Sequence, residues 1–522
     1  MPRVASEWDL DTPGAQWREA DATLCFVDIS GFTNLSERLA RRGRIGAEEL
    51  TEVLNRVFSE MLELAYDRGG ALLKFGGDAL LMLFDGADHP MQAACAAIEM
   101  RAALRAAAEI PTSVGRVRLR MSVGLHSGSV HLFRVGSLHH ELVVTGPAAT
   151  RTTELESAAS PGEILVSAET AARLSRDAAR QEVGPGRLLR WRSARVAGTG
   201  TQARRATGPG VIEQCLPEVL RDHLRTGMTE FEHRFAAVAF VKFQGIDSLM
   251  ATQGADAVAA ALDELATTVQ TAAQDEGVAF LATDIDQDGG KFILVSGVPR
   301  SQEDDEGRLL RAVRRISDAG TTLPLKIGVH RGHVFAGIVG APHRAAFTVM
   351  GDTVNLAARL MSAAPRGEIY TTPSVLDRSR VLFEVTPIPP FMVKGKAQPV
   401  QAYAVGPESG TRSSTTRDES RFTGRTAELA LLAESFAQFR LGSGLPVVVV
   451  GETGVGKSRL VREAVAAAEL EAFTVRGEPT GTTTPYSAFR EPVRALLSFR
   501  RDTPETMAAS LRDAVIALDI GL

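Results

Sequence analysis

Residues 26–33 read FVDISGFT, and residues 72–84, which follow one amphipathic helix, read LLKFGGDALLMLF. In the first stretch Asp28 ends an apolar strand that a Ser-Gly pair interrupts. In the second, a Gly-Gly pair allows a tight turn between two apolar strands, with Asp78 at its tip. Two aspartates held side by side predict a two-metal site for phosphoryl transfer. Taken one at a time, Asp28 could cap a helix and Asp78 could be an ordinary turn residue.

Size and composition are those of a globular protein with about three or four domains. The 522 residues are 44% hydrophobic and 23% charged, and the net charge is −5. That charge gives no general attraction to nucleic acid or to an anionic membrane, so neither is expected as a partner. The chain has three cysteines, no apolar stretch long enough to span a membrane, and no signal peptide at its start. We therefore expect free thiols and a cytoplasmic protein.

An internal repeat organises most of the chain. Residues 120–137 (RMSVGLHSGSVHLFRVGS) match 325–341 (LKIGVHRGHVFAGIVGA), and 22–32 match 237–246. Each copy reads as strand, helix, hairpin, helix, strand, helix. In the first copy the helix carries an apolar stripe: Leu50, Val53, Leu54, Val57, Phe58, Met61 and Leu62. The pattern predicts an α/β (α+β) protein with two ferredoxin-like βαββαβ domains, each a mixed sheet with helices on one face.

Composition divides the chain further. The stretch at 406–420 is polar and rich in Ser, Thr and Gly, which is typical of a flexible linker. The predicted segments are an N-terminal extension at 1–20, a first repeat at 21–205, a linker with a short helical run at 206–230, a second repeat at 231–405, the flexible linker at 406–420 and a further domain at 421–522.

The further domain opens with a phosphate-binding pattern. An apolar run at 447–450 precedes GETGVGKS at 451–458 and a helix, which predicts a strand, a glycine-rich loop and a helix whose N-terminus faces phosphate. The residues expected to bind nucleotide are Gly451, Gly454, Gly456, Lys457 and Ser458. Lys457 would reach the β- and γ-phosphates, and Ser458 would bind Mg2+. Roughly 100 residues remain after 421, so we expect a partial P-loop α/β domain that binds nucleotide without hydrolysing it.

The stretches at 26–33, 72–84, 348–360 and 391–403 resemble the class III nucleotide cyclases, and more narrowly the tandem soluble, bicarbonate-responsive adenylyl cyclases. The segment after 421 resembles the AAA/STAND-type ATPase that follows such a pair. The resemblance implies two cyclase domains that pair within one chain, as a monomer, with sites at their interface. It also implies that ATP is converted to cyclic AMP and pyrophosphate with two Mg2+ or Mn2+ ions. One ion activates the ribose 3'-hydroxyl, and the other holds the triphosphate.

By the same resemblance, the first copy supplies the metal ligands Asp28 and Asp78, with the Ile29 carbonyl as a further ligand. The second copy supplies the residues that stabilise the transition state. Asn355 orients the ribose, and Arg359 meets charge that develops on the α-phosphate. These two lie four residues apart and share a helix face, although alone they would read as a cap and a surface charge.

Substrate contacts are also implied in the second copy, where Thr348 would contact the base and Lys396 the triphosphate. The lysine that normally reads the base maps to Ala282, and its loss weakens binding or selectivity by about 1–3 kcal/mol. In the converse arrangement Lys242 replaces Asp28, and Thr150 and Glu154 replace Asn355 and Arg359. One site is therefore expected to be active and the other degenerate.

In the resembling family the degenerate site binds bicarbonate. Lys74 is retained there, but Thr153 stands at the arginine position, so we expect bicarbonate activation to be weak or absent. Two other functions remain open. The tandem pair could be a catalytically weak or inactive nucleotide-sensing module that regulates the attached ATPase, which Ala282 favours. A diguanylate cyclase has a similar GGD hairpin but lacks the helix with asparagine and arginine.

Overall fold

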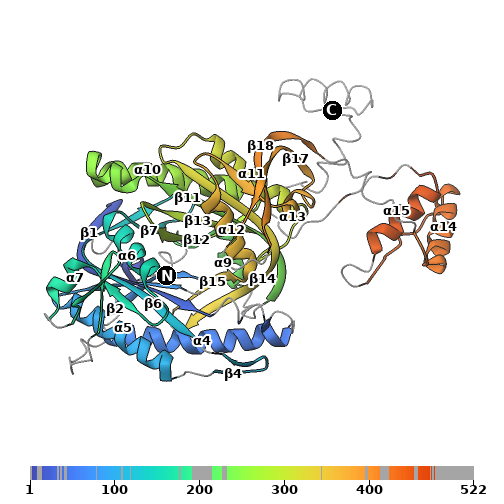
Figure 1. Ribbon diagram of the computed structural model, residues 1–522. Coiled ribbons are helices and arrows are strands. Elements are labelled where there is room, and N and C mark those ends of the chain that lie inside the picture. Colours follow the sequence, from blue (N-terminus) through green and yellow to red (C-terminus); the bar gives the residue numbers. More distant parts are fainter. Residues whose placement is uncertain are drawn as a thin grey trace. The chain divides into compact units, whose positions relative to one another are not determined.

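The structure is a computed structural model, shown in Figure 1. It describes residues 3–8, 14–31, 35, 38–39, 44–77, 79–106, 110–117, 119–175, 178–190, 214–225, 232–341, 344–393, 398–411, 422–451, 456–470, 472 and 475. The chain divides into two compact units, Met1–Arg412 and Ser413–Leu522. The first unit contains both copies of the repeat.

The first copy has the predicted βαββαβ core. Its elements are β1 (Trp17–Ser30), α4 (Arg44–Asp67), β2 (Gly70–Gly76), β3 (Ala79–Asp85), α5 (His89–Ala106) and β6 (Arg120–Val135), preceded by α1 (Arg3–Ser6). The antiparallel strand order β2-β3-β1-β6 is the ferredoxin-like order, so this prediction is confirmed. The copy continues through β4 (Ile110–Thr112), β5 (Gly115–Val117), β7 (Glu141–Thr145), α6 (Pro147–Ala158), β8 (Ile164–Val166), α7 (Ala168–Arg173), β9 (Gln181–Val183) and β10 (Gly186–Leu188).

The second copy repeats this plan after helix α9 (Glu218–Arg225). Its core elements are β11 (Glu232–Gln244), α10 (Ile246–Glu276), β12 (Ala279–Asp286), β13 (Gly289–Ser296), α11 (Asp305–Asp318) and β14 (Leu325–Ala341). Beyond them lie β15 (Arg344–Met350), α12 (Asp352–Ala363), β16 (Ile369–Thr371), α13 (Pro373–Leu376), β17 (Val381–Phe391) and β18 (Val400–Thr411). The strand order β12-β13-β11-β14 matches that of the first copy. Strand β18 pairs with β17 as far as Thr411, inside the stretch expected to be a linker.

Side chains of β1 alternate between two apolar cores, because successive residues of a strand face opposite sides of the sheet. Cys25, Val27 and Ile29 pack with the buried stripe of α4, while Leu24 belongs to a separate core on the other face. That second core includes residues of α6. The expectation that helices cover one face only is therefore wrong. Both faces of the sheet are apolar, and both are covered.

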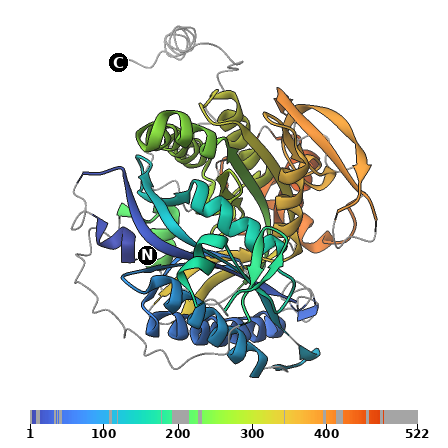
Figure 2. The same cartoon turned by 60° about the vertical axis from the view of Figure 1, so that its left-hand side comes forward.

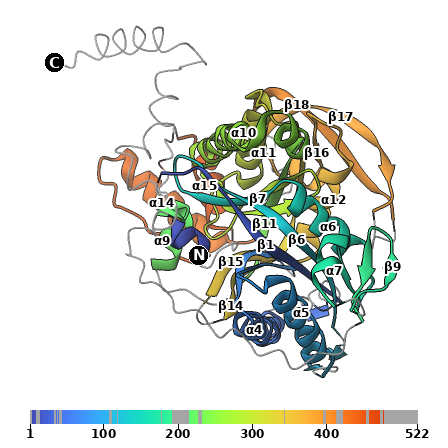
Figure 3. The ribbon, with the colours of Figure 1, turned by 90° about the vertical axis from the view of Figure 1, so that its left-hand side faces the viewer.

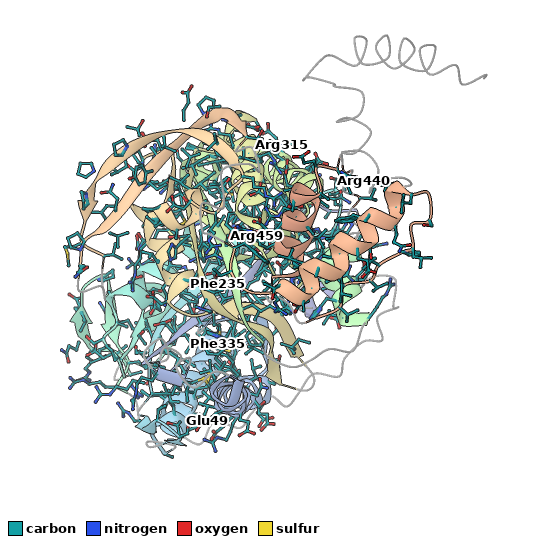
Figure 4. All side chains as sticks on the ribbon, turned by 90° about the vertical axis from the view of Figure 1, so that its right-hand side faces the viewer. Glu49, Phe235, Arg315, Phe335, Arg440 and Arg459 are labelled. Atoms are coloured by element: carbon teal, nitrogen blue, oxygen red, sulfur yellow. The ribbon has the colours of Figure 1, made fainter. Side chains whose placement is uncertain are left out.

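The two copies pair through two long strands, each of which stays in its own sheet and packs residues into the core of the other copy. Phe335 and Val339 of β14 belong to the core built on α4, and Phe133 and Val135 of β6 belong to the core built on α10. Figure 2 shows the first copy, blue to teal, below the second, and Figure 4 shows Phe335 close to α4. Equivalent hydrogen bonds close both contacts: Gly136 N to Asp263 Oδ1 (2.8 Å) and Gly340 N to Asn55 Oδ1 (3.1 Å). The predicted intramolecular pseudo-dimer is confirmed.

In the second unit, the described residues form α14 (Thr426–Arg440) and α15 (Lys457–Ala467). The apolar run Val447–Val450 was expected to be a strand, but it has no regular structure, and Val448 and Val450 are exposed. A strand needs a hydrogen-bonded neighbour, and no strand lies among residues 422–451, 456–470, 472 and 475. None of the helices described in either unit is both long and apolar enough to cross a bilayer.

Candidate active site

A cavity of about 600 Å³ lies between the two copies. One side of it carries Asp28 and the hairpin residues Gly76 and Gly77, and the other carries Thr348 and Asn355. The sequence placed these residues in different copies, more than 250 residues apart for the most distant pairs. The cavity brings four of the predicted site residues into one space, namely Asp28, Lys74, Thr348 and Asn355. Its volume lies within the range of about 300–1,000 Å³ that is usual for ligand pockets.

Asp28 reaches the cavity because alternate residues of β1 face opposite sides of the sheet. Phe26 and Asp28 both line the cavity, whereas Val27 and Ile29 face the core beneath α4. The Ile29 side chain is only 2% exposed and is not among the lining residues, so only its main-chain carbonyl could serve a metal. β1 ends at Ser30, and Gly31 follows with φ 97°, a conformation that favours glycine.

The β2–β3 hairpin, whose turn carries the second predicted metal ligand, also lines the cavity. Asp78 itself lies outside the described residues. Its neighbour Ala79 is the direct Cα partner of Asp28 across the sheet and also lines the cavity. Gly77 has φ 72°, as the tight turn requires. Carboxylate and carbonyl oxygens are the ligands Mg2+ and Mn2+ prefer, so the donors here fit such ions.

The opposite side of the cavity is formed by β15 and α12. Thr348 lies on β15, and Asn355 lies in the first turns of α12, after Gly351. Arg359 lies one turn later and is partly exposed, but it is not among the lining residues. Lys396 lies outside the described residues. The structure thus brings Asp28, Thr348 and Asn355 together and leaves Arg359 at the margin of the cavity.

Strand register tests the assignment of the lost base-reading lysine. In the first copy, Lys74 on β2 is the partner of Leu81 on β3, and Leu81 is the partner of Phe26 on β1. In the second copy, Ala282 on β12 is the partner of Ile293 on β13, and Ile293 is the partner of Phe240 on β11. Because Phe26 and Phe240 occupy equivalent positions in the repeat, Ala282 is the structural equivalent of Lys74. Ala282 lines the cavity, so a methyl group stands at the position where the repeat's other copy has an ammonium.

At the converse site, one lysine stands where the first copy has Asp28, and a second lysine lies opposite it on the neighbouring strand. Lys242 stands at the Asp28 position and donates to Asp286 Oδ1 at 2.8 Å. Lys291, its Cα partner on β13, lies 3.1 Å from Asp284 Oδ2. Burial favours a neutral amine, but Asp284 and Asp286 outweigh it and raise the pKa of Lys291 above its usual range. With ammonium groups already paired to these carboxylates, the residues do not fit divalent cations.

Lys74 is also engaged by the protein. It forms an ion pair with Glu141 and donates to Thr283 Oγ1 at 2.7 Å, and Thr283 in turn donates to Glu141 at 2.8 Å. Lys74 and Glu141 are each 11% exposed. Burial alone would raise the pKa of Glu141, but Lys74, His139 and these hydrogen bonds lower it below its ordinary value of 4.5. This network joins the two copies and neutralises the lysine expected to meet an anion.

Hydrogen bonds between threonine hydroxyls and backbone groups also join the two copies along this contact, which we call the seam. Thr145 Oγ1 donates to the Gly289 carbonyl at 2.8 Å, and the Asp288 N–H donates to Thr150 Oγ1 at 2.9 Å. Thr150 is the residue that replaces Asn355 in the first copy. Its hydroxyl thus holds the β12–β13 turn of the second copy instead of facing a ligand.

The second unit shows part of the phosphate-binding loop. Gly456 has φ 96° and precedes α15, whose first residues are Lys457 and Ser458. Lys457 Nζ donates to the Gly451 carbonyl at 2.7 Å. Gly454 lies outside the described residues. Residues 452–455 as a whole lie outside the described residues, and the helix predicted to follow the loop is present as α15.

Several cavity residues were not identified from the sequence. Lys291 and Asp284 come from TDIDQDGGK, in which acidic and basic residues alternate with the two-residue period of a strand. Glu141 carries no motif. Leu216, Leu220 and Leu224 lie in the supposed linker, where their spacing of four residues could have indicated a helix with one apolar face.

Comparison with known proteins bears on this site. Residues 16–188 and 229–406 each match the Adenylate and Guanylate cyclase catalytic domain, and residues 421–519 match the AAA ATPase domain. Human adenylate cyclase type 10 is 24% identical over 497 residues, which cover 84% of this chain and 30% of the human protein. The rat protein of the same name is 25% identical over 429 residues, covering 73% and 26%. The chain thus spans less than a third of these relatives.

A solved structure shares the tandem fold. A class III adenylyl cyclase-like ATP-binding protein from Pseudomonas aeruginosa superposes with a TM-score of 0.50 at 12% identity, covering 69% of this chain and 85% of that one. This likeness concerns the fold alone. The two family matches together span most of the first unit and coincide with the two sheets that enclose the cavity. The chain therefore belongs to the adenylate and guanylate cyclase catalytic domain family, with two copies of that domain ahead of an AAA ATPase domain.

Proposed function

We propose that this protein is an adenylate cyclase that converts ATP to cyclic AMP and pyrophosphate at one site between its two copies. The observation that carries the proposal is the shared cavity, in which Asp28 of the first copy faces Thr348 and Asn355 of the second. The converse site is degenerate, since Lys242 and Lys291 are paired with carboxylates there. One chain thus contains a complete site, and a monomer suffices.

Each residue has a defined task in this proposal. Asp28, Asp78 and the Ile29 carbonyl would hold two Mg2+ or Mn2+ ions, which when bound would lower the pKa of the 3'-hydroxyl and offset triphosphate charge. Asn355 orients the ribose for in-line attack on the α-phosphate. Arg359 extends from α12 to meet the charge on that phosphate, and Lys396 holds the remaining phosphates. Thr348 contacts the base.

The proposal is tested by direct assay. Purified protein is incubated with ATP or GTP and either Mn2+ or Mg2+, and cyclic product is separated and quantified. A higher yield of cyclic AMP than of cyclic GMP supports the proposal. A complete lack of cyclic product from both nucleotides with both metals would favour the alternative below. In the second unit, Gly451, Gly454, Gly456, Lys457 and Ser458 are proposed to bind a separate nucleotide.

The alternative is a nucleotide-sensing module that binds ATP without cyclising it and regulates the attached ATPase domain. Ala282 favours it, since the cavity lacks the lysine that would read the base. The Pseudomonas aeruginosa protein with the same tandem fold is itself described as ATP-binding and adenylyl cyclase-like. The presence of Asp28 and Asn355 in one cavity favours catalysis, which a sensor does not require.

Substituting Ala282→Lys is expected to lower the KM for ATP by about tenfold. A lysine at this position restores a hydrogen bond to the base, worth about 1–3 kcal/mol. Steady-state kinetics of cyclic AMP formation measure the effect, with kcat expected to change less than KM. As a control, Ala345→Lys places the same charge on the exposed Ala345 of β15. Equal effects of the two substitutions would mean that added charge, not base reading, lowers KM.

Bicarbonate is expected not to activate the enzyme. The degenerate site holds Lys74 in an ion pair with Glu141 and offers Thr153 in place of an arginine, so an added anion finds no unpaired ammonium there. Cyclase rates are compared in sodium bicarbonate and sodium chloride at equal pH and ionic strength. A saturable increase specific to bicarbonate would contradict this expectation.

A further inference from the structure

The segment that joins the two copies reaches the cavity. Residues of the predicted linker line it over one continuous stretch, namely Cys215, Leu216, Pro217, Leu220 and Leu224. Leu220 and Leu224 are four residues apart and therefore share one face of α9, and Leu216 lies two residues before the helix begins. Figure 3 shows α9 beside the sheets and away from α4 and α5. The linker thus adds an apolar surface to a cavity otherwise built by the two catalytic copies.

Contacts hold this segment to both copies. The His140 N–H of the first copy donates to the Gln214 carbonyl at 2.7 Å. On the second copy, the His223 ring meets Phe347 edge-to-face with centroids 5.2 Å apart, and Gln274 Nε2 lies 3.5 Å from Glu218 Oε2. Leu220 is 5% exposed. The helix is therefore part of the packed unit and not a loose connection.

These contacts place α9 at the base end of the cavity. Phe347 immediately precedes Thr348, the residue proposed to contact the base, and α9 also contacts β12, which carries Ala282. Asp28 and the Gly76-Gly77 turn mark the metal end. The cavity retains a volume of about 600 Å³ with α9 against it, so the helix borders the space without filling it.

The base end is largely apolar. The side chains that line it together with α9 include Phe240, Leu281, Ile293, Ile338 and Phe347. With Ala282 in place of a lysine, packing against the flat faces of a purine is the main interaction this region offers. We infer that Leu220 and Leu224 of α9 form a wall against which the purine base packs. This inference rests on the proposed nucleotide site and assigns part of it to the connection between the copies.

Binding of a fluorescent nucleotide tests the wall without requiring turnover. The probe is N-methylanthraniloyl-ATP with Mg2+, labelled on the ribose so that the base stays unmodified. Full-length protein carrying Lys457→Ala is used as the background, to remove binding at the phosphate-binding loop of the second unit. In this background Leu220→Ala is expected to raise Kd about tenfold and Leu224→Ala about threefold, from lost apolar contact.

Two matched variants separate contact from folding. Val219→Ala removes similar bulk from α9 at a position that does not line the cavity, and should change Kd less than about twofold. Leu220→Met keeps an apolar side chain of similar volume and should restore most of the affinity. Because an apolar wall does not read polar groups, the same loss is expected with N-methylanthraniloyl-GTP.

The possible results are distinguishable. If the background binds the probe and both leucine variants bind it with unchanged affinity, the proposed wall is wrong. The proposed cyclase site would then remain intact. A loss restricted to one base would also overturn it, because that pattern indicates polar reading. A background that does not bind the probe at all would overturn the proposed nucleotide site itself, and the wall with it.

Discussion

Asp28→Asn is expected to lower kcat for cyclic AMP formation about 10³-fold. The substitution keeps the size of the side chain but removes the charge that holds the catalytic ions, whose contribution is several kcal/mol, and each 1.36 kcal/mol is worth tenfold in rate. Asp28 is suited to this test because it lines the cavity from the end of a well-paired strand. A side-chain amide there should leave the fold unchanged. The rate is measured with saturating ATP and Mn2+.

The matched control is Lys242→Gln, at the equivalent position of the second copy. Lys242 is paired with Asp286 at the degenerate site, so its loss should change kcat by less than about threefold. Nucleotide affinity in the Asp28→Asn variant should fall less than kcat, because the base and ribose contacts come from the other copy. Similar kcat losses in Asp28→Asn and Lys242→Gln would contradict the assignment of one active and one degenerate site.

Local sequence signals predicted the frame of this site. The period-two alternation around Asp28, the Gly-Gly turn and the apolar stripe of α4 each specify an element through neighbouring residues alone. The internal repeat then supplied what no local signal contains, namely that the two sheets have one plan and can pair. For this reason the ferredoxin-like order and the pairing of copies were predicted correctly, and Asp28, Thr348 and Asn355 lie in one cavity.

What the sequence did not predict depends on contacts between distant segments. Glu141 has no neighbouring motif, and its role follows only from Lys74 on another strand and Thr283 in the other copy. Residues 447–450 are apolar and β-branched, yet strand formation requires a pairing partner that the described part of the second unit does not offer. The role of α9 follows from its position against Phe347, which spacing alone cannot give.

The two sites between the copies differ in the residues that form them. At the degenerate site, the protein's own lysines and carboxylates pair with one another, and Thr145 and Thr150 bond across the seam. Asp28 and Asn355 of the other site face a cavity whose lining also includes Lys74, Glu141, Asp284 and Lys291. Duplication thus allows one seam, formed by these paired charges and threonines, to fix the relative position of the copies. The residues around Asp28 and Asn355 can then bind a ligand. The stability of the pair should depend on that seam.

Glu141→Gln tests that dependence and is expected to destabilise the first unit by about 3–5 kcal/mol. Removing one partner of a buried ion pair leaves the other charge uncompensated, here the Lys74 ammonium at 11% exposure. Differential scanning calorimetry of the full chain should show a Tm lower by several degrees. The control is Glu154→Gln, because Glu154 pairs with Arg151 at 3.1 Å but is 40% exposed, and such pairs contribute about 0–1 kcal/mol.

Two further measurements identify the cause as the ion pair. The double variant Lys74→Met with Glu141→Leu removes both charges, so most of the lost Tm should return. The pKa of Glu141 is depressed in the folded protein, so its stabilisation is present above pH 4.5 and is lost as pH falls through the folded pKa. The Tm difference between wild type and Glu141→Gln should therefore shrink as the pH falls below 4.5. A difference that stays constant into acid, or a double variant no more stable than Glu141→Gln, would show that charge pairing does not stabilise this seam.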